Sequence, residues 1–136
     1  YAQMGRGKTE RTVANALAGI ASTVSRLAFD ACLYNSQNFG FIKLPDQYTT
    51  GSSIMPHKKN PDVFELTRAK CNRLQSLPYQ ITMILNNLPS GYFRDMQLIK
   101  EAFLPAFDEL KSILNMVNAN VVGNQGKHRC GSGRPL

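Results

Sequence analysis

The sequence predicts an all-α protein built from long antiparallel helices, and three observations support that fold class. Apolar residues recur at alternating spacings of three and four over three long stretches, which is typical of the buried face of a helix in a bundle. The stretches are separated by segments that contain Gly, Pro and Ser, residues that interrupt helices. No region reads convincingly as a strand.

The first predicted helix runs from about Thr9 to Asn38, and Gly40 is expected to terminate it. Its apolar residues have a near-heptad period suited to packing in a bundle. The predicted face consists of Val13, Leu17, Ile20, Val24, Leu27, Ala31 and Tyr34.

The second predicted helix begins at Asn60-Pro61-Asp62, where Asn60 can cap, Pro61 suits a first turn and Asp62 is favourable to the helix dipole. Pro78 falls inside the pattern, so we expect one kinked helix rather than two separate ones. The helix should end at residues 88–91. Its predicted face consists of Val63, Leu66, Lys70, Leu74, Leu77, Ile81, Ile84 and Leu88.

The third predicted helix runs from Asp95 to about Val122, and Pro105 should bend it or delay its regular part. Its predicted face consists of Ile99, Phe103, Ala106, Leu110, Ile113 and Val117. Residues 1–122 are therefore expected to form part of a central helical-bundle domain. Residues 123–136 are polar and rich in Gly, and we expect them to be disordered or foreign to the parent sequence.

The predicted helices are long for a chain of 136 residues. At 1.5 Å per residue they reach roughly 40 Å, and each has few partners within the chain. Their apolar faces would then be buried against other chains or missing segments, so we expect an oligomer.

Composition narrows the choice of partners. The net charge of +7 comes from basic residues scattered along helices, which argues against a nucleic-acid partner and leaves open a solvated surface or a small polyanionic substrate. No apolar run approaches the roughly 20 residues of a membrane span, and no leader pattern is evident, so the cytoplasm is expected. Cys32, Cys71 and Cys130 are widely spaced, and neither a metal site nor a disulfide is expected.

Chemistry is concentrated between Thr49 and Asn60. Gly51 and the serines that follow it permit a loop that can close over a ligand. Lys58 and Asn60, just ahead of a helix N-terminus, suit a carboxylate, because cation, amide and backbone N–H groups all favour negative charge. The alternative is a polar connection followed by an ordinary helix cap.

Residues 51–60, Gly-Ser-Ser-Ile-Met-Pro-His-Lys-Lys-Asn, resemble the Gly-Ser-Ser-x-Met-Pro-x-Lys-x-Asn signature of the fumarase/aspartase superfamily. Within it the chain is similar to the argininosuccinate lyase family. That similarity lies in Phe39-Gly40-Phe41-Ile42 with Asp46, in Lys58 to Asp62 with Glu65-Leu66, and in Leu88-Pro89 followed by Tyr92-x-Arg94-Asp95-x-Gln97-x-x-Lys100-Glu101. The resemblance covers about Thr9 to Val117.

The resemblance implies a fumarase/aspartase-type bundle that forms a homotetramer and eliminates arginine from argininosuccinate, releasing fumarate, in arginine biosynthesis. It implies no metal or organic cofactor. Ser52 would be the catalytic base, and Lys58 and Asn60 would stabilise the doubly charged aci-carboxylate. Tyr92, Gln97 and Lys100 would bind the substrate. Ser53 and His57 are expected to be loop residues without an assigned step.

Two departures limit what the chain can do alone. Leu98-Ile99 stands where the lyases usually have acidic residues, which puts fine substrate contacts there in question. The family's Ser-Arg-Asn and Thr-His segments would lie upstream of Tyr1, and family sites combine three subunits, so the chain alone should be inactive. The alternatives are another fumarate-releasing lyase of the superfamily and a non-catalytic helical oligomerisation module.

Overall fold

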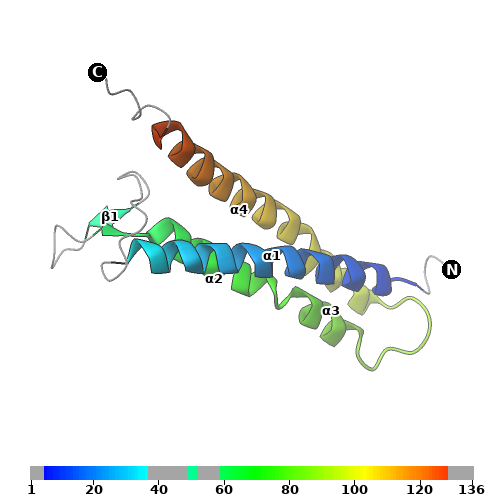
Figure 1. Ribbon diagram of the computed structural model, residues 1–136. Helices are drawn as coiled ribbons and strands as arrows, with labels where there is room; N and C mark the ends of the chain where they lie inside the picture. The colour runs from blue at the N-terminus through cyan, green and yellow to red at the C-terminus, as the bar shows by residue number, and fades with distance from the viewer. Residues whose placement is uncertain (1–4, 37–48, 52–58, 129–136) are drawn as a thin grey trace, which may run out of the picture.

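The computed structural model describes residues 5–36, 49–51 and 59–128, and the fold is described for these residues. Four α-helices make up most of them, which confirms the all-α prediction (Figure 1). A pair of two-residue strands was not predicted, because a ladder this short leaves no periodic pattern in the sequence. The elements in order are α1 (Lys8–Asn35), β1 (Thr50–Gly51), β2 (Lys59–Asn60), α2 (Asp62–Leu74), α3 (Leu77–Leu85), the 3-10 helix η2 (Arg94–Gln97) and α4 (Leu98–His128).

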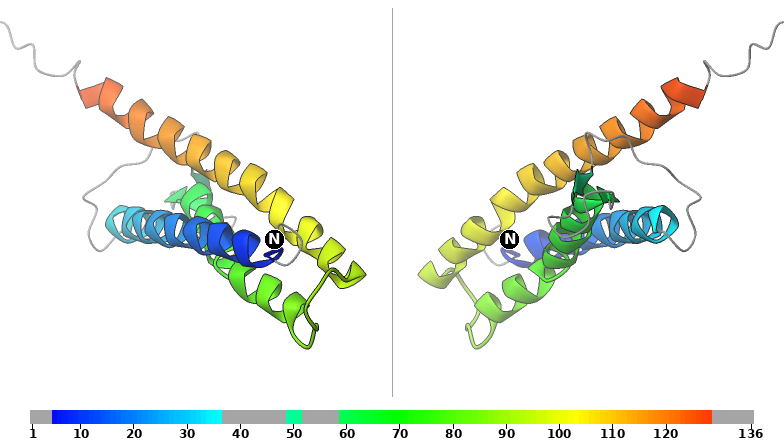
Figure 2. Two further views of the ribbon diagram at one scale, coloured as in Figure 1. Left: turned by 90° about the vertical axis from the view of Figure 1, so that its right-hand side faces the viewer. Right: turned by 90° about the vertical axis from the view of Figure 1, so that its left-hand side faces the viewer.

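The chain passes back and forth through the bundle. α2 is antiparallel to α1, α3 continues in the direction of α2, and α4 returns alongside α1 (Figure 1). Figure 2 shows that α4 crosses the other helices at an angle, so that its C-terminal end points away from them. β1 and β2 lie at one end of the bundle, and the connection from α3 to η2 lies at the other.

α1 carries two apolar faces, and the single face predicted from the sequence contains residues of both. Ala14, Ala21 and Ala28 recur every seven residues and are fully buried, and Leu17 and Val24 are buried beside them with a small part of their surface exposed. By contrast Ile20, Leu27 and Tyr34 of the predicted face are 41–45% exposed. Small alanine side chains allow a neighbouring helix to approach closely, so the tertiary packing buries them in preference to larger residues. The helix also ends at Asn35, earlier than predicted, with Ser36 in an extended conformation, and Gly40 lies outside the described residues.

The buried face of α2 is displaced by one residue from the predicted one. Phe64, Thr67 and Cys71 are buried where Val63, Leu66 and Lys70 were expected, and Leu66 is 61% exposed. Thr67 can be buried because its hydroxyl donates a 2.7 Å hydrogen bond to the carbonyl of Val63 one turn earlier. From Leu74 onward the buried residues Leu74, Leu77 and Ile81 match the prediction.

The expected single kinked helix is in fact two helices. Gln75 and Ser76 separate α2 from α3, and Pro78 lies in the first turn of α3. Proline has no N–H group and cannot continue the hydrogen-bond ladder of α2, but it is well tolerated in a first turn. α3 ends at Leu85, before the predicted stop at residues 88–91, and Asn87 follows with a φ of 63°.

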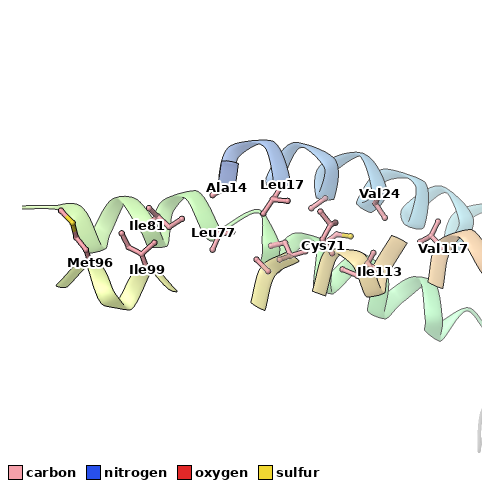
Figure 3. Packing of buried hydrophobic residues seen from close by; sticks show 14 residues of the cluster. Ala14, Leu17, Val24, Cys71, Leu77, Ile81, Met96, Ile99, Ile113 and Val117 are labelled. Carbon is pink, nitrogen blue, oxygen red and sulfur yellow. The ribbon is translucent and has the colours of Figure 1, made fainter. Parts of the chain in front are cut away.

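The predicted face of α4 is confirmed. Five of its six residues are buried, and Phe103 packs half-buried against them. Pro105 lies inside the helix, which continues past the predicted end near Val122 to His128. Figure 3 shows the resulting core, in which side chains of α1, α2, α3, η2 and α4 point toward one another. The labelled residues are Ala14, Leu17, Val24, Cys71, Leu77, Ile81, Met96, Ile99, Ile113 and Val117.

Cys71 is fully buried, and burial, followed by the nearby carboxylate of Glu109, raises the pKa of its thiol. By length and composition alone α1 could cross a membrane, although no long uninterrupted apolar run was found in the sequence. Its apolar composition follows from its two apolar faces, one of which packs inside the bundle.

Candidate active site

The signature segment is anchored by the short β ladder. Gly51 pairs with Lys59 and Thr50 pairs with Asn60 in antiparallel register. Paired residues in such a ladder have their Cα atoms about 5 Å apart. Ser52 and Lys58 lie outside the described residues, but Ser52 directly follows Gly51 and Lys58 directly precedes Lys59. The connection that carries both residues therefore begins and ends at one pair.

This ladder leads directly into α2. Asn60 is the last residue of β2, and Pro61 rather than Asn60 occupies the N-cap of α2. The carbonyl of Pro61 accepts hydrogen bonds from the N–H groups of Phe64 and Glu65 at 2.9 and 3.1 Å. The predicted capping position of Asn60 is thus wrong by one residue, because β pairing extends the chain through Asn60 before the helix begins.

The second group of candidate residues lies around η2. Tyr92 precedes η2 and is 42% exposed, Gln97 ends η2, and Lys100 lies in the first turn of α4. The side-chain amide of Gln97 donates a 3.3 Å hydrogen bond to the hydroxyl of Tyr92. Gln97 and Lys100 are exposed. The fold therefore brings a phenol and an amide into contact and presents a lysine one turn further on.

The sequence pattern missed one neighbour of this group. The guanidinium carbon of Arg6 lies 5.1 Å from the centroid of the Tyr92 ring, within the range of a cation–π interaction. In the sequence Arg6 is only one of several polar residues ahead of the first helix. No spacing rule could have linked it to Tyr92, because the two residues meet only when α1 packs against α3 and α4.

The two groups of candidate residues lie at opposite ends of the bundle. The β ladder is next to the C-terminal end of α1, whereas Tyr92 contacts Arg6 ahead of its N-terminal end (Figure 1). α1 has 28 residues and is therefore about 42 Å long. Within one chain, the fold does not bring Asn60 near Tyr92, Gln97 and Lys100.

Metal-binding clusters and pockets are the other features that could mark a site among the described residues. Within residues 5–36, 49–51 and 59–128, no cluster of three or more His, Cys, Asp or Glu residues could hold a metal ion. A pocket lies between α1 and α2, and its lining includes Arg26, Phe29 and Arg68 but none of the candidate site residues.

Comparison with known proteins identifies the family. Residues 10–76 match the family described as Lyase. The chain is 82% identical over 117 residues to the argininosuccinate lyase of Parabacteroides distasonis and 80% identical over 116 residues to that of Bacteroides thetaiotaomicron. These alignments cover 86% and 85% of the chain and 26% of each relative.

A more distant relative, the argininosuccinate lyase of Stenotrophomonas maltophilia, is 45% identical over 119 residues, which is 88% of the chain and 27% of that protein. The chain thus spans about a quarter of the length of the curated relatives it matches. On these similarities the chain belongs to the argininosuccinate lyases.

Proposed function

We propose that the protein to which this chain belongs eliminates arginine from argininosuccinate and releases fumarate, and that this chain supplies the residues of two parts of its active site. The observation that carries the proposal is the register of the β ladder: Gly51 is paired with Lys59 at the head of α2. The two residues that the resemblance assigns to chemistry, Ser52 and Lys58, are the immediate chain neighbours of that pair. The names of the similar proteins support the choice of substrate.

The proposed reaction begins with removal of a proton from the carbon next to a carboxylate. Ser52 is the base, and its hydroxyl is activated by Lys58 and by the nearby N-terminus of α2. Loss of the proton places two negative charges on one carboxyl group, so the barrier depends mainly on stabilising that charge. Lys58 supplies a cation and Asn60 an amide donor for this aci-carboxylate. The carbon–nitrogen bond then breaks, arginine leaves, and fumarate remains, without a metal or organic cofactor.

Tyr92, Gln97 and Lys100 are proposed to bind the substrate. A phenol, an amide and an ammonium group are all hydrogen-bond donors to carboxylates, of which argininosuccinate has three. The contact between Gln97 and Tyr92 supports a joint role, because it fixes the phenol relative to the first turn of α4. Leu98 is exposed beside them, and it leaves this part of the surface without the acidic residue usual in the family.

We further propose that the active lyase is a cytoplasmic homotetramer. One chain holds its two groups of site residues at opposite ends of α1, so a complete site requires groups from different subunits. The second apolar face of α1, with Ile20, Leu27 and Tyr34, is exposed in one chain and is suited to pack against another copy. A small metabolite as substrate fits the cytoplasm.

A substrate panel tests the proposed reaction. The protein assayed is a complete lyase that carries this sequence, for example the Parabacteroides distasonis relative with its matching segment exchanged. Fumarate absorbance is followed with argininosuccinate, adenylosuccinate, aspartate and malate. Argininosuccinate should give the highest kcat/KM, and the 136-residue chain alone should be inactive.

Preference for another substrate would assign the chain to a different lyase of the superfamily. No turnover of any substrate by a correctly assembled protein would leave the non-catalytic helical module as the explanation.

A further inference from the structure

We propose that Arg6 is a positioning residue for substrate binding: its guanidinium group holds the ring of Tyr92 so that the phenol faces the substrate in a fixed orientation. The inference rests on the proposed function, because it takes Tyr92 to be a substrate-binding residue. It adds a residue that neither the signature segment nor the pattern from Tyr92 to Lys100 contains.

The orientation of the Tyr92 side chain depends on its neighbours, because its place in the chain restrains it little. It lies in the connection between α3 and η2, outside regular secondary structure, and its side chain is 42% exposed. An exposed side chain without contacts samples several rotamers, and ordering it on substrate binding costs free energy. Its interactions with described residues include a hydrogen bond that Gln97 donates to the hydroxyl and a cation–π contact with Arg6, which lies over the ring.

The hydrogen bond and the cation–π contact restrain different parts of the Tyr92 side chain. A hydrogen bond to the hydroxyl fixes the end of the side chain, at 3.3 Å from the Gln97 amide, but leaves rotation about that end possible. A guanidinium group prefers the face of an aromatic ring, so Arg6 defines the plane of the ring.

The backbone next to Arg6 is restrained at Gly7. Gly7 is buried and has a φ of +89°, a conformation that L side chains rarely adopt. A Cβ atom on Gly7 would lie 2.6 Å from two side-chain carbons of Leu85, at the end of α3. The N–H of Gly7 donates a 2.6 Å hydrogen bond to a carboxylate oxygen of Glu10. Residue 7 is therefore held against both α1 and α3, and this restrains the backbone next to Arg6.

Steady-state kinetics of the complete lyase test the proposal with matched variants. Arg6→Ala should raise the KM for argininosuccinate by about three- to tenfold, the range expected for loss of a cation–π contact, with little change in kcat. Arg6→Met, which keeps most of the length but not the charge, should behave like Arg6→Ala. Arg6→Lys keeps a cation and should recover most of the affinity. Lys8→Ala removes the same charge two residues away and should leave KM unchanged.

A double-mutant cycle separates positioning from a general effect. If Arg6 acts through the ring, then Arg6→Ala should have no further effect on KM once Tyr92→Leu has removed the ring. Equal effects of Arg6→Ala with and without Tyr92 would overturn the proposal, as would an unchanged KM in Arg6→Ala or an equal rise in Lys8→Ala. The proposal would also be overturned if the rise in KM came with a lower melting temperature of Arg6→Ala, because loss of folded structure would then explain the rise.

A failure of the proposed function can be distinguished from a failure of the role proposed for Arg6. If the unsubstituted lyase does not release fumarate, the elimination reaction is excluded. The same variants are then ranked by calorimetric binding of argininosuccinate, where Arg6→Ala should still weaken binding more than Lys8→Ala. Equal binding by the two variants, or no binding by the unsubstituted protein, would overturn the role of Arg6.

Discussion

The two ends of the bundle hold their candidate site residues by different means. At one end, backbone pairing joins Gly51 to Lys59, the described residues on either side of Ser52 and Lys58, for which we propose the chemical roles. At the other end, side chains from separate elements meet: Arg6 ahead of α1, Tyr92 after α3 and Gln97 in η2. The first arrangement fits a segment that supplies reacting groups, and the second fits a preformed surface that orients a substrate. The fold thus holds the residues proposed for chemistry and the residues proposed for substrate binding at opposite ends of α1.

The largest effect is expected at the end with the β ladder. Ser52→Ala in the complete lyase should lower kcat by about 10²- to 10⁴-fold, because a general base contributes on that scale. The oligomer and its melting temperature should be unchanged. Ser53→Ala is the matched control and should retain most of the turnover, measured by fumarate release. Normal turnover in Ser52→Ala would remove Ser52 from the role of base.

Hybrid oligomers test whether the two ends serve one site through different subunits. Ser52→Ala subunits and Tyr92→Ala subunits are each expected to form oligomers of low activity. After dissociation and reassembly of a mixture, some sites should receive an intact Ser52 from one subunit and an intact Tyr92 from another. Fumarate release by the mixture should then exceed that of either variant alone. A mixture no more active than its components would show that both ends serve a site within one chain.

The exposed face of α1 should control assembly, and through it activity. Leu27 is 45% exposed in the single chain, so Leu27→Glu should leave the helical content intact but place an unpaired charge in a subunit interface. We expect smaller species by analytical ultracentrifugation and a parallel loss of turnover. Asn15→Glu adds the same charge at another exposed position of α1 and should have no such effect. Full assembly of Leu27→Glu would exclude this face from the interface.

The smallest effect concerns the backbone beside Arg6. Gly7→Ala introduces a positive-φ alanine and a contact of 2.6 Å with Leu85, so the free energy of unfolding should fall by about 1–3 kcal/mol. Gly19→Ala in α1 meets nothing within 4 Å and should raise the free energy of unfolding by about 0.5–1 kcal/mol. Denaturant titration measures both. Equal stability of the two variants would show that Gly7 does not fix the chain at this end.

Much of the fold and part of the candidate site could be predicted from local patterns. The apolar period predicted the helices and most of the buried face of α4, and ten consecutive residues predicted a carboxylate site. Ser52 and Lys58 lie outside the described residues, so their roles stay predictions. The break after Leu74 was mistaken for a kink, because Pro78 is compatible with either a kinked helix or the first turn of a new one.

The sequence by itself determined the fold class, the approximate helices and the signature segment, because each depends on residues that are close together in the chain. Only the tertiary structure decided which face of α1 is buried, since Ile20 and Ala21 both lie in apolar patterns and the choice depends on how closely α2 can approach. It alone also decided that Arg6 lies over Tyr92 and that Tyr92 lies far from the β ladder. Those relations arise from helix packing, which brings together residues that no local period connects.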